Sequence, residues 1–302
     1  MTRTLVLHTL PADPTLIDTD LSLPAAGVAA ALEDVVVEGV RGEPGELLAL
    51  LRRHQPDVVF NLCEAPCGVA TWEPHVPALL AWLGQRHTGA GSEALALCHR
   101  KDRVRALLGS AGVPIPGSGG LPAFVKPVAE HGSAGIEAGC LCRDATEVEA
   151  QRARLGLVVV EDYLPGRELV VALWGREAEH AAVGEVRFPA HRPFLTWEAK
   201  WLPTSDDYRG TTTAYPAEVS PALEAELLHA ARGAWAAIGL WGYARMDLRL
   251  DAEGRPRVID VNPNPDLTPD DGLTSTSGMA RAVLSAGWSW ADFIRFQVEI
   301  AR

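Results

Sequence analysis

The sequence predicts an α/β protein (α+β in its later part), and three observations support this. The chain has 302 residues, more than one hydrophobic core usually fills, so we expect two or three compact units around a shared cleft. Its composition, 47% hydrophobic and 22% charged, is typical of a folded globular protein. Strand and helix patterns alternate from the first residues onward, which is the pattern of a sheet covered by helices.

The first ninety residues predict a unit that opens as strand, helix, strand. The expected strands are 4–8, 35–37 and 57–62, and the expected helices are 21–32, 46–53 and 76–83. Gly89-Ala-Gly91 then marks a turn, and we place a domain boundary near residue 90.

The remaining chain carries a different order of elements. A helix carrying Lys101 begins at Ser92, and a Pro- and Gly-rich link then leads to a strand at Ala123–Pro127. A glycine-rich turn follows this strand directly. Further strands are expected at 157–161 and 169–174, and further helices at 221–238 and about 290–300.

Charge and cysteine content exclude several classes of function. The formal net charge of −12 argues against general affinity for nucleic acid or anionic lipid, although a single triphosphate remains compatible with it. No signal-length or membrane-spanning apolar run is present, so we expect a cytoplasmic protein without a membrane partner. The five cysteines lack a zinc spacing and are interpreted as reduced thiols.

A hairpin is predicted near the carboxyl end of the chain. The strand patterns 243–250 and 257–262 flank the polar turn Asp251-Ala-Glu-Gly254. Strand periodicity places Arg245 with Asp247 on one face and Asp260 with Asn262 on one face. Antiparallel pairing can bring the two sets together into one polar patch.

Two carboxylates and a carboxamide in such a patch are suitable ligands for Mg²⁺, and Mn²⁺ is possible as well. The alternative is a solvated hairpin with incidental ion pairs. The apolar neighbours of Asp260 indicate a half-buried strand, where a charge needs a partner, so the sequence favours a metal site.

Other polar residues suggest a phosphate and nucleoside site. Lys126 ends an apolar strand just before the small-residue segment 127–135, and such a loop can present backbone N–H groups to phosphate. The segment from Glu161 to Glu168 reads as a hinge, in which a carboxylate such as Glu168 can accept hydrogen bonds from ribose hydroxyls. Each pattern alone is equally compatible with an ordinary turn.

Taken in order, several segments resemble the ATP-grasp superfamily, most closely the D-alanine:D-alanine ligases. The resemblance covers nearly the whole chain. Its segments are Val58–Glu64, Val76–Leu80, Thr88–Gly91, Phe124–Pro127, Glu161–Glu168, Glu198–Lys200 and Ala244–Asp247. It implies an ATP-grasp fold with an N-terminal Rossmann-like (pre-ATP-grasp) domain at 1–90, a central subdomain at 91–165 and a C-terminal subdomain with the metal site at 166–302.

The resemblance also implies roles for individual residues, with ATP and Mg²⁺ as cofactors. Lys101, Lys126 and Lys200 correspond to lysines that contact the ATP phosphates, and Ser133 to a serine of the loop that covers them. Glu161 and Leu164 correspond to the adenine hinge, and Glu168 to the ribose contact. Asp247, Asp260 and Asn262 correspond to the metal ligands, and Arg245 to the arginine that stabilises the transferring phosphate. Arg245, Ser133 and Lys200 are therefore the expected catalytic residues.

The sequence departs from the family pattern at the substrate end. The family glutamate that holds the first substrate has only Asp18 or Asp20 as a counterpart here, and the family histidine after the Val-Phe-Asn strand is replaced by Glu64. Asp266 stands where the family has glycine, and Trp201 where it has tyrosine, so that only an indole N–H can donate there. Glu64, Asp18 and Asp266 are our expected substrate residues.

The resemblance implies a ligase that joins a small-molecule carboxylate to an amine through an acyl phosphate, and a homodimer. An amino acid or small peptide is the expected substrate, and D-alanine is not assigned. Two alternatives remain at this point: a nucleotide-binding regulator without turnover, and an ATP-grasp ligase acting on a non-amino-acid carboxylate.

Overall fold

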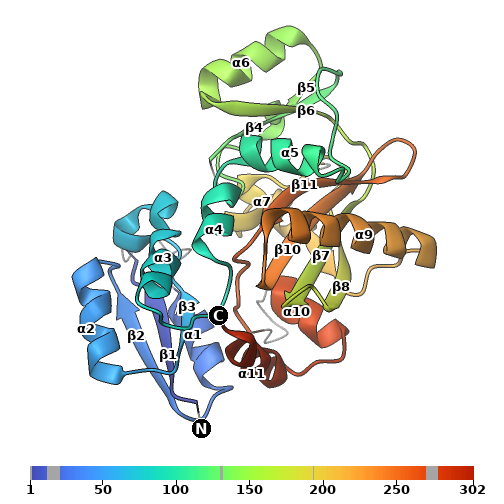
Figure 1. The fold of residues 1–302 in the computed structure, drawn as a ribbon. Coiled ribbons are helices and arrows are strands. Elements are labelled where there is room, and N and C mark those ends of the chain that lie inside the picture. Colours follow the sequence, from blue (N-terminus) through green and yellow to red (C-terminus); the bar gives the residue numbers. More distant parts are fainter. Residues whose placement is uncertain (1, 12–20, 130–131, 193, 270–277) are drawn as a thin grey trace.

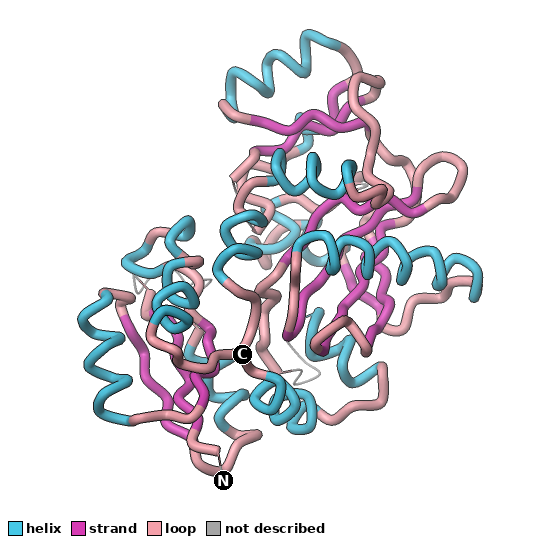
Figure 2. The backbone as a smooth tube through the Cα atoms, viewed as in Figure 1, coloured by secondary structure: helices cyan, strands magenta, loops and turns pink. Residues whose placement is uncertain are grey.

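A computed structural model of the protein describes residues 2–11, 21–129, 132–192, 194–269 and 278–302. The described strands form three sheets, of three, three and five strands. Figure 1 shows the first sheet in an N-terminal unit to one side, the second sheet at the far end, and the large sheet between them. Figure 2 shows that helices cover each sheet, which confirms the predicted fold class.

The N-terminal sheet is parallel, in the order β2-β1-β3. Its strands are β1 (Thr4–Thr9), β2 (Val35–Val40) and β3 (Val58–Leu62), and its helices are α1 (Ser22–Ala29), α2 (Pro44–His54) and α3 (His75–Trp82). Two short 3₁₀ turns, Pro66–Gly68 and Ala70–Trp72, precede α3. All six predicted elements of this unit are confirmed, with ends shifted by a few residues.

The N-terminal sheet shares its core with the end of the chain. Val6 of β1 and Phe60 of β3 are fully buried in one cluster with Phe293 of α11 (Trp290–Ile300) and Met279 of α10 (Gly278–Ser285). Backbone hydrogen bonds also join His87 and Arg302 in both directions. The C-terminal helices therefore connect the N-terminal unit to the rest of the molecule (Figure 1).

The second sheet is antiparallel, in the order β5-β4-β6. Its strands are β4 (Ala123–Pro127), β5 (Leu141–Cys142) and β6 (Val158–Asp162). The helix α6 (Ala145–Leu155) packs on it, and the short 3₁₀ turn Ala138–Cys140 precedes β5.

The single helix predicted from Ser92 through Lys101 is wrong, because the structure has two helices there. They are α4 (Ser92–Cys98) and α5 (Lys101–Ser110), separated at Arg100, whose φ of −129° and ψ of 84° are not helical. The Lys101 backbone N–H instead donates to the carbonyl of Val128 at 3.1 Å. The break places Lys101 in the first turn of α5, beside the end of β4.

The large sheet is antiparallel, in the order β11-β10-β7-β8-β9. Its strands are β7 (Glu168–Gly175), β8 (His180–Arg187), β9 (Thr212–Ala214), β10 (Gly242–Leu250) and β11 (Pro256–Asn262). The helices are α7 (Trp197–Trp201), α8 (Asp206–Gly210) and α9 (Pro221–Ile238). Ser220 caps the start of α9, and Gly239 ends it with a φ of 75°, a conformation that suits glycine.

Strand alternation gives the large sheet two different faces. On β10, Ala244, Met246 and Leu248 belong to a buried cluster that includes Trp235 of α9. The intervening residues of β10 point to the opposite face. Tyr243 joins the cluster around α10 and α11 there, whereas Arg245, Asp247 and Arg249 belong to no hydrophobic cluster of the described residues. The part of this face that carries these three residues is available for a polar site, and α9 packs against the other face of the sheet.

We propose the domain boundaries 1–90, 91–165 and 166–302, since each sheet lies within one of these segments. All five cysteines lie within the described residues, and none is paired with another. No helix within the described ranges has the length and apolar character needed to cross a membrane.

Candidate active site

A cleft lies between the second sheet and the polar face of the large sheet, and it encloses about 1090 Å³ of space that is partly open to solvent. All eleven residues predicted for ATP binding, metal binding or catalysis line it: Lys101, Lys126, Ser133, Glu161, Leu164, Glu168, Lys200, Arg245, Asp247, Asp260 and Asn262.

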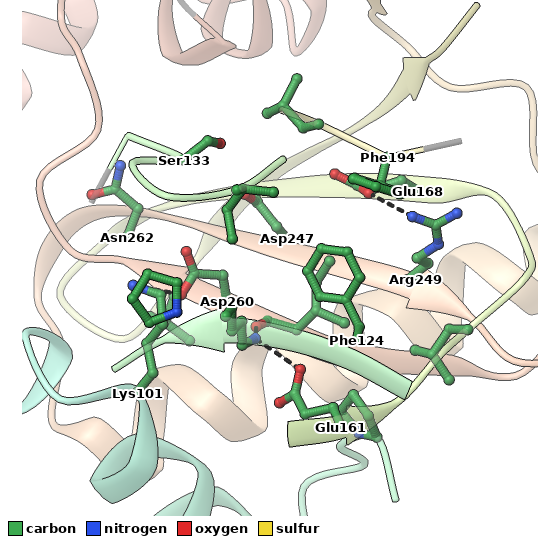
Figure 3. A pocket seen from close by; sticks show the side chains of 18 of the residues that line it. Lys101, Phe124, Ser133, Glu161, Glu168, Phe194, Asp247, Arg249, Asp260 and Asn262 are labelled. Carbon is green, nitrogen blue, oxygen red and sulfur yellow. Dashed lines mark hydrogen bonds and ion pairs between the residues drawn. The ribbon is translucent and has the colours of Figure 1, made fainter. Parts of the chain in front are cut away.

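Figure 3 shows how these side chains are distributed along the cleft. Lys101 and Asn262 lie at one end, Glu168 and Arg249 lie at the other, and Asp247 and Asp260 lie between them. Charged side chains therefore lie at both ends of the cleft and between them.

The predicted hairpin forms from β10 and β11, and it brings the expected metal ligands together. Asp247 pairs with Asp260 across the ladder, and Arg245 pairs with Asn262. Asp251 and Gly254 close the turn through backbone hydrogen bonds. The strand register shifts by one residue between Asp247 and Leu248. This β-bulge arises because Ile259 on β11 has no partner on β10.

Arg245 holds Asp247 in a bidentate ion pair. Its Nε and Nη2 donate to the two carboxylate oxygens at 2.8 and 3.0 Å. This attraction raises the pKa of Arg245 above its ordinary value. Burial and repulsion by Arg245 lower the pKa of Lys200, which lies on α7 at the same part of the cleft. Two cations thus converge beside Asp247.

Lys126 bridges the two sheets that enclose the cleft. Its Nζ donates to the carbonyl of Ile259 on β11 at 2.6 Å and lies 2.8 Å from Glu161 Oε2 on β6. Arg105 of α5 binds the other oxygen of Glu161 at 2.9 Å. Because Ile259 has no partner on β10, its carbonyl is directed at Lys126. The register shift in the hairpin therefore provides the acceptor that positions the Lys126 side chain.

A second buried ion pair occupies the opposite end of the cleft. Arg249 Nη1 lies 3.3 Å from Glu168 Oε2, and both side chains are 7% exposed. Burial raises the pKa of Glu168 to about 7, and repulsion by Asp247 adds to this, while the attraction of Arg249 opposes it. Arg249 also contacts Tyr163 of the hinge, with Nη2 3.3 Å from the hydroxyl.

Apolar side chains complete this end. Phe124 of β4 and Phe194 meet edge to face, with ring centroids 5.0 Å apart, and both line the cleft. Sequence reasoning missed Arg249, Tyr163 and Phe194 as site residues. The alternation Arg245, Asp247, Arg249 was a usable signal for Arg249, whereas Phe194 lies in an irregular loop with no local pattern.

The loop over the other end is described from Gly132 onward. Ser133 adopts a left-handed φ of 63°, which is uncommon for a residue with a side chain and is often found at functional sites. The indole N–H of Trp201 donates to the Gly132 carbonyl at 2.8 Å, the only type of donation available to this residue. Trp201 thus connects α7 to the loop that carries Ser133.

Two of the three expected substrate residues do not line the cleft, and the third cannot be placed. Asp18 lies outside the described residues, and neither Glu64 nor Asp266 is among the cleft-lining residues. Burial and repulsion from Glu73 and Asp266 raise the pKa of Glu64 to about 8, so these carboxylates form an acidic cluster. Their position relative to substrate stays a prediction.

A hydrogen-bond network connects this acidic cluster with the hairpin. The Asn264 backbone N–H donates to Asn262 Oδ1 at 2.9 Å, and its side chain donates to Glu73 Oε1 at 2.7 Å. The other oxygen of Glu73 contacts His99 Nε2 at 2.8 Å, and the Tyr243 hydroxyl lies 3.4 Å from Asn264 Oδ1. The network joins the N-terminal unit, α4 and the loop after β11.

The donor set fits magnesium bound together with phosphate oxygens. Among the described residues, no three His, Cys, Asp or Glu side chains are grouped to hold a metal by themselves. Asp247 and Asp260 supply two carboxylates, and Asn262 adds a carboxamide oxygen. Mg²⁺ is usually held by one or two carboxylates plus substrate phosphates, which suits this open set better than a closed metal centre.

Comparisons with known proteins assign the family. The family model described as the D-ala D-ala ligase C-terminus matches residues 113–299. A D-alanine–D-alanine ligase of Paramagnetospirillum magneticum is 30% identical over 310 residues, covering 94% of this chain and 95% of that protein. The chain belongs to the D-Ala D-Ala ligase family.

A second relative is similar over most of its length, and solved structures show the same fold. The uncharacterized protein y4sG of Sinorhizobium fredii is 31% identical over 306 residues, covering 92% of this chain and 87% of that protein. The crystal structure of a D-alanine–D-alanine ligase from Bacillus anthracis complexed with ATP has a TM-score of 0.76 at 18% identity, covering 99% and 97% of the two chains. The VanG D-Ala:D-Ser ligase from Enterococcus faecalis has a TM-score of 0.75 at 18% identity, covering 99% of each chain. The predicted ATP-grasp fold is confirmed.

Proposed function

We propose that this protein is an ATP-dependent ligase that joins a carboxylate to an amine and releases ADP and phosphate. One observation carries the proposal: all eleven residues that the order of motifs predicts for ATP binding, metal binding or catalysis line a single cleft. A likeness in sequence order alone would not require side chains more than 150 residues apart, such as Lys101 and Asn262, to converge.

The residues of the chain suggest how the reaction is supported. Lys101, Lys126 and Lys200 supply positive charge to the cleft, and Ser133 lies in the loop at its phosphate end. Asp247, Asp260 and Asn262 would hold Mg²⁺, which, when bound, neutralises charge on the phosphate oxygens. A substrate carboxylate would attack the γ-phosphate, and an amine would then displace phosphate from the acyl phosphate.

Arg245 is the proposed stabiliser of the transferred phosphate and of the tetrahedral intermediate. Its guanidinium is held in one orientation by both oxygens of Asp247, so it is preorganised before substrate arrives. Phosphoryl transfer requires mainly such positioning and charge stabilisation from a protein. This complete set of polar residues favours turnover over a regulator that only binds nucleotide.

We propose an amino acid or a small peptide as the amine-bearing substrate. Glu73 and Asp266 place negative charge next to the loop that follows Asn262, where an ammonium group would be attracted. The raised pKa of Glu64 keeps its carboxyl largely protonated at neutral pH, and a nearby ammonium group would favour its ionised form. Relatives in the family are named for D-alanine, but the substitution of Glu64 and Asp266 at two family positions supports a different amine here. We also propose a cytoplasmic homodimer, which light scattering would test.

Product analysis tests the function directly. The protein is incubated with Mg²⁺-ATP and a panel of D- and L-amino acids and dipeptides, and products are identified by mass spectrometry. We expect phosphate release only when a particular carboxylate and amine are both present. If D-alanine alone yields its dipeptide, the proposed change of amine is wrong. If no panel member or cell extract couples ATP consumption to a new product, the ligase assignment fails.

A further inference from the structure

The strongest unassigned feature is the Arg249–Glu168 pair at the nucleoside end of the cleft. The two residues are direct partners on the neighbouring strands β10 and β7, and both side chains point into the cleft (Figure 3). Arg249 is the third charged residue on this face of β10, after Arg245 and Asp247. Neither the phosphate site nor the metal site needs it.

The surroundings of Arg249 direct its guanidinium to Glu168. On its other side, Arg249 is paired in register with Arg257 of β11, a like charge that repels it. Arg257 is itself bound to Asp251, at 2.9 Å from Nη2 to Oδ2. Arg249 Nη1 therefore lies near Glu168, while Nη2 lies 3.3 Å from the Tyr163 hydroxyl.

Aromatic contacts hold the guanidinium in this orientation. Its central carbon lies 5.2 Å from the centroid of the Tyr163 ring and 6.0 Å from that of Phe188. Cations within about 6 Å of an aromatic ring are attracted to its face. Arg249 is thus fixed by the hinge on one side and by β7 on the other.

Only one carboxylate oxygen of Glu168 is used by Arg249. The ion pair involves Oε2, and no described residue donates a hydrogen bond to Oε1. Glu168 lines the cleft, so Oε1 is available to a ligand hydroxyl. A carboxylate held on one oxygen by a fixed cation presents the other in one direction, where its two lone pairs can accept hydrogen bonds from the hydroxyls of a vicinal diol.

We propose that Arg249 is a positioning residue that orients Glu168 for the ribose hydroxyls and so determines the preference for ribonucleotides over deoxyribonucleotides. This inference rests on the proposed function, because it takes ATP as the ligand of the cleft.

Nucleotide binding tests the inference without any knowledge of the amino substrate. Dissociation constants for Mg²⁺-ATP, 2′-deoxy-ATP and 3′-deoxy-ATP are measured by calorimetry on the whole chain. We expect the wild type to bind ATP at least roughly tenfold more tightly than the deoxy analogues, the size expected for hydrogen bonds to a charged group. In Arg249→Met, we expect this preference to fall to about twofold or less, mainly through weaker ATP binding.

Arg167→Met is the matched control. Arg167 precedes Glu168 in sequence and also binds a carboxylate, Glu185, at 2.7 Å, but it does not line the cleft. We expect this variant to keep the wild-type preference. Glu168→Gln should lose it, and the double variant with Arg249→Met should lose nothing further, because both changes remove the same interaction.

The outcomes separate a positioning role from a structural one. Equal loss of ATP and deoxy-ATP affinity in Arg249→Met would overturn the inference, as would a preserved preference or a wild type that binds all three nucleotides equally. If Arg249→Met does not fold, as judged by circular dichroism, Arg249→Lys takes its place. That variant keeps the charge but loses the forked geometry, and we expect its preference to fall by about threefold or more. Failure of the wild type to bind ATP would overturn the proposed function itself.

Discussion

Asp247 and Asp260 lie directly opposite each other on β10 and β11, so two carboxylates share one position of the hairpin. Like charges at such a position repel and destabilise the folded chain, unless a cation lies between or beside them. Arg245 binds Asp247 closely, whereas Lys101 Nζ lies 4.0 Å from Asp260, whose side chain is 43% exposed. Asp260 is therefore the more exposed of the two, since the side chain of Asp247 is 14% exposed.

Asp260→Asn is expected to raise the stability of the ligand-free protein and to reduce its stabilisation by Mg²⁺-ATP. Without ligands, removal of one repelling charge should raise the melting temperature by roughly 2 °C. The additional stabilisation caused by Mg²⁺-ATP should be largely lost, because the metal loses a ligand. Thermal unfolding with EDTA and with Mg²⁺-ATP measures both effects. Asp247→Asn is the contrast, since it breaks the bidentate pair with Arg245 and should lower stability in either condition.

Lys126→Ala is expected to reduce both turnover and stability. Glu161 keeps Arg105 but loses one partner, and the Ile259 carbonyl loses its donor, so the free energy of unfolding should fall by about 2 kcal/mol. ATP-dependent product formation should fall at least a hundredfold, which is measured with the substrates found in the product screen. Retained full activity would show that Lys126 has no role at the phosphates.

The double variant Lys126→Ala, Glu161→Gln is the control for the stability effect. Replacing the carboxylate with an amide removes the poorly neutralised charge that the first change leaves behind. We expect chemical denaturation to show partial recovery of stability with no recovery of activity. A further loss of stability would indicate that Glu161 is held mainly by Arg105.

Glu64 is expected to make stability fall as pH rises. Its pKa is raised from 4.5 to about 8, so between these values the folded chain retains a proton that the unfolded chain has released. The free energy of unfolding should therefore decrease through this window, by at most about 1.4 kcal/mol per pH unit from this group. Glu64→Gln should flatten the slope and be relatively more stable than the wild type at pH 8.

Denaturation at several pH values measures this slope. Some slope should remain in Glu64→Gln, because the pKa of Glu168 is also raised, to about 7, and acts in the same direction. Glu226→Gln is the matched control, because Glu226 is exposed on α9. This variant should show the same dependence of stability on pH as the wild type. Identical slopes for the wild type and Glu64→Gln would rule out the proposed acidic cluster.

Asn264 is expected to hold the loop after β11 against the N-terminal unit. Asn264→Ala leaves one oxygen of the largely buried Glu73 without its donor, which should cost about 1–2 kcal/mol of stability. Asn264→Asp should cost more at neutral pH, because it places a carboxylate against Glu73, and the difference between the two variants should shrink below pH 5. Urea denaturation at pH 7.5 and pH 4.5 measures both, and equal costs at both values would contradict the contact.

The sequence predicted the hairpin site well because its determinants are local. Alternation along β10 and β11 and a short polar turn are sufficient to place Asp247, Asp260 and Asn262 on one face. The unpaired Ile259 was not predictable, since nothing in its neighbours marks a shifted register. The break between α4 and α5 was missed for a similar reason, as Arg100 carries no glycine or proline signal.

Contacts between distant segments were the least predictable part of the site. Asn264, Glu73 and His99 meet only because three separate elements pack together, and no spacing in the sequence connects them. Arg249 and Glu168 are 81 residues apart and become partners only when β10 pairs with β7. The ordered motifs predicted the energy source of the reaction, whereas the acidic cluster that bears on the substrate depends on such tertiary contacts.

The unpaired position of Ile259 implies that β11 can lose one residue at this point without loss of its pairing with β10. Val258 pairs with Leu248 and Asp260 pairs with Asp247, so the partners on either side of Ile259 are consecutive residues of β10. The strand pairing therefore does not require Ile259. A chain lacking this residue would keep the hairpin and its carboxylates but would lose the carbonyl that accepts from Lys126. Ile259 thus resembles an inserted residue that the sheet does not require but that Lys126 in the cleft uses. We expect a chain without Ile259 to fold normally and to bind or use nucleotide less well.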